Sequence, residues 1–187
     1  MFPYIGGKSH HVGWMNPLFP NKFKTFVEVF GGAGWVSVKS EKVGNATTRV
    51  YNDFNPLLAN VYECFRTQPE AVLTLMNQTP KSDLTLYRQY QEELFAKLDW
   101  NNVPLGDVSL AVKYLYLQTQ VFAGTPLSTT NVPYFTEQKA NGKYASKYDT
   151  LKKKLSDEKL TKRLKEITHA ENMDCIDLIK KYDSEDT

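Results

Sequence analysis

In the first third of the chain, apolar residues occur either in short continuous runs or at helical spacing. A short apolar run at 24–29 enters a glycine-rich turn at 30–34, which is typical of a buried strand followed by a tight turn. Asn55-Pro56 is typical of the cap and first turn of a helix. The elements expected here are a strand at Lys24–Val29, the start of a helix at Trp35–Lys42, a strand at Arg49–Asp53 and a helix over Leu57–Thr67. This order predicts an α/β sheet.

The pattern changes after residue 68. Apolar residues recur at helical spacing, which predicts helices over Glu70–Asn77, Leu84–Leu98 and Val108–Val121. The segment Phe122–Lys147 is rich in Thr, Asn, Gly and Pro and is expected to form a loop. The final elements expected are a basic amphipathic helix at Asp149–Lys165, a third strand at Glu166–His169 and a helix at Cys175–Tyr182. We interpret the middle block as a helical insertion into an α/β core.

Composition narrows the class of protein. The 187 residues are 41% hydrophobic and 24% charged, which is ordinary for a globular domain with a modest insertion. The apolar runs are shorter than the roughly 18 residues of a membrane span, and the first residues lack the pattern of a signal peptide. Cys64 and Cys175 have no CxxC spacing, so neither a disulfide framework nor a thiolate metal site is indicated. We expect a cytoplasmic protein that contacts no membrane.

The charge is unevenly distributed along the chain. The net charge is +2, yet residues 139–166 hold ten Lys or Arg and four Asp or Glu, whereas residues 171–187 hold six acids and two lysines. A local basic stretch suits a polyanion bound on one face. The same stretch is also compatible with an ordinary solvated helix face, and charge alone favours that simpler interpretation.

The glycine turn has an acidic residue at a suggestive distance. Asp53 lies 19 residues beyond Gly34, and an acid at the end of a second strand can hold both hydroxyls of a ribose. A purely structural turn is an equally good interpretation. Ser37 stands where a dinucleotide fingerprint has its third glycine, and Gly7-Lys8-Ser9 lacks the spacing of a phosphate-binding loop. His10, His11 and His169 have no partners at metal spacing, so we expect surface or strand-end histidines and no metal.

Three motifs in order change this picture: Tyr4–Lys8, Glu28–Gly34 and Asp53–Asn55. Together they resemble the Dam-like (D12 class) family of S-adenosylmethionine-dependent DNA adenine-N6 methyltransferases. Its pattern is aromatic-x-Gly-Gly-Lys, then Glu-x-Phe-x-Gly-x-Gly, then Asp-x-Asn. Asn131-Val132-Pro133-Tyr134 and Asn172-Met173-Asp174 match later parts of the pattern. The resemblance therefore covers the whole chain.

The resemblance implies a partial Rossmann-like methyltransferase sheet with an inserted helical target-recognition domain. The implied division is 1–67 for the S-adenosylmethionine-binding part, 68–147 for the recognition insertion and 148–187 for the return to the α/β domain. It also implies a cytoplasmic enzyme of bacterial or phage origin that acts on double-stranded DNA, as in restriction-modification, and needs no metal.

The cofactor residues implied come from all three motifs. The N-terminal segment would close over the methionine part, the glycine turn would lie beneath it, Asp53 would accept the ribose hydroxyls and Phe54 would pack on the adenine. Glu28 would orient the loop or face the methionine amino group, and an acidic lining suits a cofactor with two positive groups. The implied set is Tyr4, Ile5, Gly6, Gly7, Lys8, Glu28, Phe30, Gly31, Gly32, Ala33, Gly34, Asp53, Phe54, Asp174 and Cys175.

The DNA-binding residues implied lie in the loop-like segment. They are Phe122, Gly124, Thr125, Asn131, Tyr134, Lys139 and Lys143. The segment lacks the arginine that many Dam-like enzymes place there, and guanine is most often read by Arg or Lys, so no target sequence is carried over. Lysines of the basic stretch would contact phosphates, which position a duplex without specifying its sequence.

Family enzymes methylate an adenine flipped out of the duplex and use an Asp-Pro-Pro-Tyr motif on a fourth strand. This tetrapeptide is absent from the chain, so no catalytic residue is assigned within it. Asn131–Tyr134 precedes the third strand and is rejected as a substitute. Family spacing places the motif just beyond Thr187, so we expect a truncated or split enzyme. Without a fourth strand, the first would be an unpaired apolar edge, completed by another chain or by a second copy.

Two other interpretations remain open. The chain could be a catalytically inert subunit or remnant that binds S-adenosylmethionine or DNA. It could instead be a nucleotide-dependent enzyme that uses the glycine turn for NAD or ATP.

Overall fold

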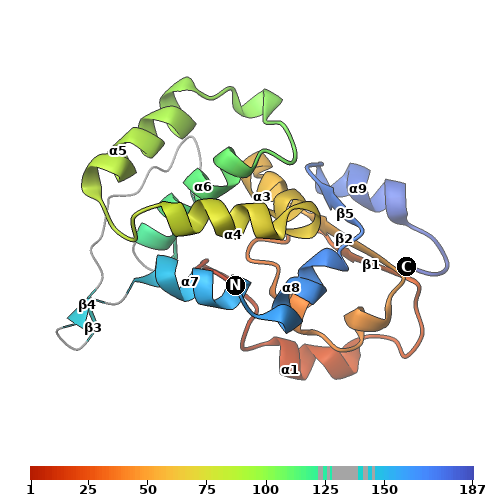
Figure 1. Cartoon of the computed structure of the whole chain (residues 1–187). Helices are drawn as coiled ribbons and strands as arrows, with labels where there is room; N and C mark the ends of the chain where they lie inside the picture. Colours follow the sequence, from red (N-terminus) through yellow and green to blue (C-terminus); the bar gives the residue numbers. More distant parts are fainter. Residues whose placement is uncertain (122–123, 126, 128–138, 141–142, 145) are drawn as a thin grey trace.

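The computed structural model of the protein describes residues 1–121, 124–125, 127, 139–140, 143–144 and 146–187 (Figure 1). The helices are α1 (Val12–Met15), α2 (Trp35–Lys39), α3 (Pro56–Thr67), α4 (Pro69–Gln78), α5 (Leu84–Glu92), α6 (Val108–Gln120), α7 (Lys147–Leu155), α8 (Glu158–Lys165) and α9 (Cys175–Tyr182). Short helical turns are η1 (Asn16–Leu18), η2 (Val43–Asn45), η3 (Glu93–Lys97) and η4 (Trp100–Asn102). The strands are β1 (Thr25–Glu28), β2 (Thr48–Asn52), β3 (Lys139–Ala140), β4 (Lys143–Tyr144) and β5 (His169–Glu171).

The main sheet has three parallel strands in the order β1-β2-β5. Val27 pairs with Val50, and Val50 pairs in turn with His169. The expected α/β class is thus confirmed as a small parallel sheet with helices, and the first two strands lie where the apolar runs predicted them. Within the described residues, β2 is the central strand and β1 is an edge.

Helices of the middle block share one apolar core with the sheet. α3 packs against both β5 and α6, and Figure 1 shows α4 and α6 beside it. Tyr51 of β2 and Tyr62 of α3 stack at 3.6 Å between ring centroids, and both are fully buried. β2 is therefore anchored from its buried face by a helix that begins only a few residues after it.

The expected single helix at 149–165 is wrong. It divides into α7 and α8 because Asp157 accepts hydrogen bonds from the backbone N–H groups of Lys159 and Leu160 and so starts a new helix. The spacing of apolar residues agrees with this division. Leu155 and Leu160 are five residues apart, whereas apolar residues on one face of a single helix recur every three or four.

The third strand lies further along than expected. It begins at His169 rather than at Glu166. The residues before it make other contacts: Ile167 is buried in the core, and the Glu166 carboxylate pairs with Arg49 at 2.8 Å. The segment expected as a loop contains the antiparallel pair β3 and β4 among its described residues.

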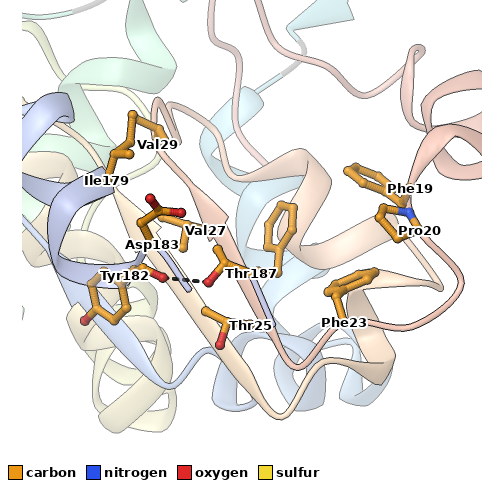
Figure 2. A pocket seen from close by; sticks show the side chains of 11 residues that line it. Phe19, Pro20, Phe23, Thr25, Val27, Val29, Ile179, Tyr182, Asp183 and Thr187 are labelled. Atoms are coloured by element: carbon orange, nitrogen blue, oxygen red, sulfur yellow. Dashed lines mark hydrogen bonds between the residues drawn. The ribbon is translucent and has the colours of Figure 1, made fainter. Parts of the chain in front are cut away.

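The outer edge of β1 borders an apolar groove of about 270 Å³ (Figure 2). Alternate residues of a parallel strand bond to a given neighbour, so Thr25 and Val27 direct their backbone groups away from β2. The Thr25 N–H donates to the Asp186 carbonyl at 3.0 Å, which brings the C-terminal segment against the start of this edge. The groove is lined by Phe19, Pro20, Phe23, Thr25, Phe26, Val27, Val29, Ile179, Tyr182, Asp183 and Thr187.

Candidate functional site

The carboxyl ends of the three parallel strands meet, and Asn52 joins them. Its side-chain N–H donates to the carbonyls of Val29 at 2.9 Å and Met173 at 3.2 Å. The Met173 N–H donates back to the Asn52 Oδ1 at 2.9 Å. Because Asn52 is buried at the end of the central strand, the loops that follow β1 and β5 are fixed to one point. In open α/β sheets this edge is where ligands bind.

The glycine turn after β1 is built for close backbone approach. The Gly31 N–H donates to the Asn52 carbonyl at 2.7 Å, and a Cβ at Gly31 would collide with the ring of Tyr51. Gly32 and Gly34 have φ values of +49° and +59°, a region that other residues enter only at a cost. The sequence places glycine where the backbone requires it.

Asp53 faces this turn from the end of β2. Its Oδ2 accepts a 2.8 Å hydrogen bond from the Gly32 N–H, and its Oδ1 accepts one of 2.9 Å from the Asn55 N–H. Burial raises the pKa of Asp53, and these two bonds oppose that rise. Each carboxylate oxygen can accept more than one bond, so both retain capacity for a ligand hydroxyl.

Asn55 shows why the chain turns here. Its side chain caps α3 by accepting from the N–H groups of Leu57 and Leu58, and Pro56 occupies the first turn, where no N–H is needed. Asp53 is thereby held between a strand end and a capped helix, which fixes the direction of its carboxylate.

Glu28 lies at the floor of the site and is 9% exposed. Its Oε2 accepts hydrogen bonds from both the backbone N–H, at 3.1 Å, and the hydroxyl of Ser37. Burial raises the pKa of Glu28 to about 7, against the opposing effects of Ser37 and the positive charge of Lys8. Ser37, which stands where a dinucleotide fingerprint has its third glycine, therefore holds the Glu28 carboxyl group in place.

The N-terminal segment covers the same space. The Gly7 N–H donates to the Tyr4 carbonyl at 3.1 Å, and the Lys8 ammonium donates to the Gly6 carbonyl at 2.9 Å, which forms a compact turn. Burial, and then the charge of Asp53, raise the pKa of Tyr4 to about 12, so its phenol stays neutral. The Ile5 N–H donates to the Gly124 carbonyl at 3.0 Å.

These pieces enclose a cavity of about 310 Å³, which we call the cofactor cavity because most of the residues expected from sequence to bind the cofactor line it. The structure brings eleven of the implied cofactor residues to its walls: Tyr4, Ile5, Gly6, Gly7, Lys8, Glu28, Phe30, Gly31, Gly32, Ala33 and Asp53. Trp35 also lines the cavity and was missed from sequence. The sequence feature that could have identified Trp35 is its position directly after the glycine turn, at the start of a helix.

Four implied cofactor residues lie outside the cavity walls. Gly34 is buried behind the turn, against Tyr62. Phe54 is 76% exposed, beyond the end of β2. Asp174 caps α9 by accepting from the Ile176 N–H at 2.8 Å, and Cys175 is the first residue of that helix. The Asn172 side chain donates to the Phe54 carbonyl at 3.0 Å, which keeps this segment next to β2.

The structure describes only part of the implied DNA-binding set. Phe122, Asn131 and Tyr134 lie outside the described residues. Gly124 is buried against Pro3 and Tyr4, with a φ of +73°. The Thr125 carbonyl accepts from the Gln118 side chain at 3.2 Å. Lys139 and Lys143 belong to β3 and β4, respectively.

Two classes of feature are absent from the described parts of the chain. No helix there is both long and apolar enough to cross a bilayer. No group of three or more His, Cys, Asp or Glu side chains in those parts is arranged to hold a metal ion.

Comparison with known proteins gives consistent matches. The model of the D12 class N6 adenine-specific DNA methyltransferase family matches residues 4–185. The chain is 35% identical over 72 residues to Modification methylase StsI of Streptococcus sanguinis, covering 37% of this chain and 10% of that protein. It is 26% identical over 137 residues to Type II methyltransferase M1.LlaDCHI of Lactococcus lactis subsp. cremoris, covering 70% of this chain and 45% of that protein. The chain thus matches less than half the length of either relative.

Proposed function

Since the chain belongs to the D12 class N6 adenine-specific DNA methyltransferase family, we propose that it binds S-adenosylmethionine in the cofactor cavity and takes part in methylating adenine N6 in DNA. The observation that carries this proposal is the pairing of two fixed acids, Glu28 and Asp53, with a glycine turn in one cavity. Bound there, S-adenosylmethionine would supply an electrophilic methyl group.

The chemistry of the cavity fits this cofactor. The remaining lone pairs of the Asp53 carboxylate suit two vicinal ribose hydroxyls. The cofactor carries a sulfonium and an ammonium group, and the carboxylate of Asp53, joined by Glu28 when it is ionised, lowers the energy of both. The glycines allow the backbone at 31–34 to approach the ligand without side-chain obstruction.

The remaining cofactor roles follow from position. Tyr4 and Lys8 close the cavity over the methionine part. Phe30 and Phe54 are 77% and 76% exposed, and exposed aromatic rings beside a polar cavity suit an adenine face. Asp174 and Cys175, at the start of α9, are proposed for the other edge of that adenine.

The proposed substrate is an adenine of double-stranded DNA, flipped out of the helix. The insertion at 68–147 is the proposed target-recognition domain. Within it, Lys139 and Lys143 are proposed to contact phosphates, and the other proposed DNA-binding residues are Phe122, Gly124, Thr125, Asn131 and Tyr134. Phosphate contacts set position, whereas base contacts set the target sequence.

The sheet itself supports a further part of the proposal. The chain contains no Asp-Pro-Pro-Tyr, and no strand among the described residues pairs with the outer, apolar edge of β1, which the C-terminal segment contacts only at its start. An exposed edge of this kind is a template for another strand. We propose that a strand from outside these 187 residues, carrying the catalytic tetrapeptide, completes the sheet along Val27.

The second candidate function is an inert cofactor- and DNA-binding subunit. It needs only the cofactor cavity and the DNA-binding residues proposed above. Both candidates predict cofactor binding, and only the first predicts methyl transfer once the sheet is complete.

The experiment that tests the function is methyl transfer to duplex DNA. The 187-residue chain is incubated with S-adenosylmethionine and unmethylated duplex, alone and with a second polypeptide bearing Asp-Pro-Pro-Tyr taken from a family member. N6-methyladenine is then measured by mass spectrometry of the nucleosides. We expect methylation only with the second polypeptide. A chain that binds the cofactor but never yields N6-methyladenine supports the inert subunit.

A further inference from the structure

A larger cavity of about 660 Å³ adjoins the cofactor cavity. The two share Tyr4, Gly7 and Trp35 in their walls. The walls of the larger one come from the N-terminal segment, α2 and α7, which are far apart in sequence. Figure 1 shows the N-terminus beside α7, where the Lys154 ammonium donates to the Met1 carbonyl at 3.0 Å.

The two neighbouring cavities differ in charge. Among the described residues, Lys39, Lys147 and Lys154 line the larger one, and no Asp or Glu does. Among the ion pairs found between described residues, none includes any of these three lysines. The smaller cavity instead contains the two acids Glu28 and Asp53 together with one lysine, Lys8. We call the larger one the lysine pocket.

Two of the ammonium groups crowd one aromatic ring. Nζ of Lys39 lies 4.8 Å and Nζ of Lys154 lies 5.6 Å from the centre of Trp35. Their hydrogen bonds go to neutral acceptors, the Ser9 hydroxyl and the Met1 carbonyl. Desolvation, and then the charge of Lys39, lower the pKa of Lys154, and desolvation lowers that of Lys147. The ring attracts both cations, and the charge of Lys39 disfavours that of Lys154, with no carboxylate among the described residues paired to either.

We propose that the lysine pocket binds one phosphate of the DNA backbone, directly beside the cofactor cavity. Lysine is a common phosphate ligand and acts as a flexible point charge. A DNA phosphate is favoured over a free anion because the pocket shares Tyr4, Gly7 and Trp35 with the cofactor cavity, beside which the substrate must lie. Such a contact positions the duplex without reading its sequence. The inference rests on the proposed function, because it names a contact to that substrate.

The test compares two double variants with the same change of charge. K147Q/K154Q removes two lysines of the pocket. K153Q/K159Q removes two exposed lysines from α7 and α8 that line none of the described cavities. Binding of a fluorescein-labelled 20-base-pair duplex is followed by anisotropy at several salt concentrations. S-adenosylhomocysteine binding is measured on the same samples by calorimetry.

Loss of one phosphate contact makes the slope of log K against log salt shallower by about 0.9. We expect this change for K147Q/K154Q beyond any change in K153Q/K159Q, with S-adenosylhomocysteine affinity within twofold of the parent chain. Equal slopes for the two variants overturn the inference, and so does the absence of duplex binding by a chain that binds S-adenosylhomocysteine. Failure to bind S-adenosylhomocysteine counts instead against the proposed function.

A second measurement separates DNA from free phosphate. The lysines are acetylated with a limiting N-hydroxysuccinimide ester and mapped by mass spectrometry. Duplex is expected to protect Lys147 and Lys154 but not Lys153, and inorganic phosphate at matched ionic strength is expected to leave the reactivity of each of the three unchanged. Protection by inorganic phosphate alone contradicts the assignment to DNA.

Discussion

The backbone N–H of Gly32 donates a 2.8 Å hydrogen bond to the Asp53 carboxylate. This bond joins the turn after β1 to the acid after β2, two points 21 residues apart in sequence. The carboxylate is therefore oriented before any ligand arrives, and a preorganised group loses less freedom on binding. A change in the shape of the glycine turn would therefore also move the Asp53 carboxylate.

The glycine turn should not tolerate a side chain at Gly34. Its φ is +59°, and a Cβ there would meet the ring of Tyr62. Gly34→Ala is expected to lower the free energy of unfolding by at least about 1–2 kcal/mol, the cost of left-handed backbone for an L-residue. Urea unfolding measures this. Gly13→Ala is the control, because a Cβ at Gly13 meets nothing within 4 Å. Equal stability of the two variants contradicts the described turn.

Glu28 should give the fold a specific pH dependence. Burial raises its pKa from 4.5 to about 7. Between those values the folded protein holds a proton that the unfolded chain releases, so stability falls as the pH rises from about 4.5 to 7. The fall is on the order of 3 kcal/mol. Glu28→Gln lacks this ionisation.

We therefore expect the free energy of unfolding of Glu28→Gln, relative to the parent chain, to increase between pH 5 and pH 8. Denaturant melts at both values measure it. Glu41→Gln, an exposed change of the same type, should show no such increase. A difference between Glu28→Gln and the parent that is constant across this range would refute the buried, protonated acid.

Arg49 supports β2 from behind the site. Its side chain is 7% exposed and pairs with Glu166 at 2.8 Å, and its guanidinium also donates to the Gly44 carbonyl at 3.0 Å. Glu166→Gln leaves a nearly buried cation without its charge partner, which is expected to cost about 3 kcal/mol. Thermal and urea unfolding measure the loss. Asp177→Asn breaks an exposed pair with Lys180 and should change stability by less than about 0.5 kcal/mol.

The groove along β1 should mediate self-association when no other strand covers it. Ile179 lines this groove and is 47% exposed. Ile176, on the same helix, is 55% exposed and lies outside the groove. Light scattering after size exclusion should therefore find dimers for the parent chain and for Ile176→Lys, and monomers for Ile179→Lys. A parent chain that stays monomeric at 100 μM, on the order of typical assay concentrations for weak dimers, counts against a sheet completed by a second copy.

Much of the cofactor cavity was predictable because its residues lie in short, ordered motifs. The apolar runs located β1 and β2, and glycine spacing located the turn between them. Parallel strands end at the same edge of a sheet, so Asp53 and the turn had to meet. The Asn52 bridge was not predictable, because its partners Val29 and Met173 contribute only backbone atoms.

Other features depended on tertiary contacts. The break between α7 and α8 depends on Asp157, whose side chain caps the second helix. An Asp within a helical pattern can either cap a new helix or leave one helix unbroken, and the pattern alone does not decide between the two. The third strand begins later than predicted, and Glu166, which was expected to start it, pairs with Arg49 instead. The lysine pocket joins residues more than 100 positions apart, and no local spacing indicates that they meet.

The most direct test of the account is calorimetric titration of the chain with S-adenosylhomocysteine. Asp53→Asn removes the charge while keeping one acceptor oxygen, and Asp177→Asn is the surface control. We predict saturable one-to-one binding by the parent chain and by the control, and binding at least tenfold weaker for Asp53→Asn with its fold intact. NAD and ATP should give no heat of binding. A folded parent chain that binds NAD or ATP but not S-adenosylhomocysteine, or an Asp53→Asn variant that binds as tightly as the parent, would contradict the assigned cavity.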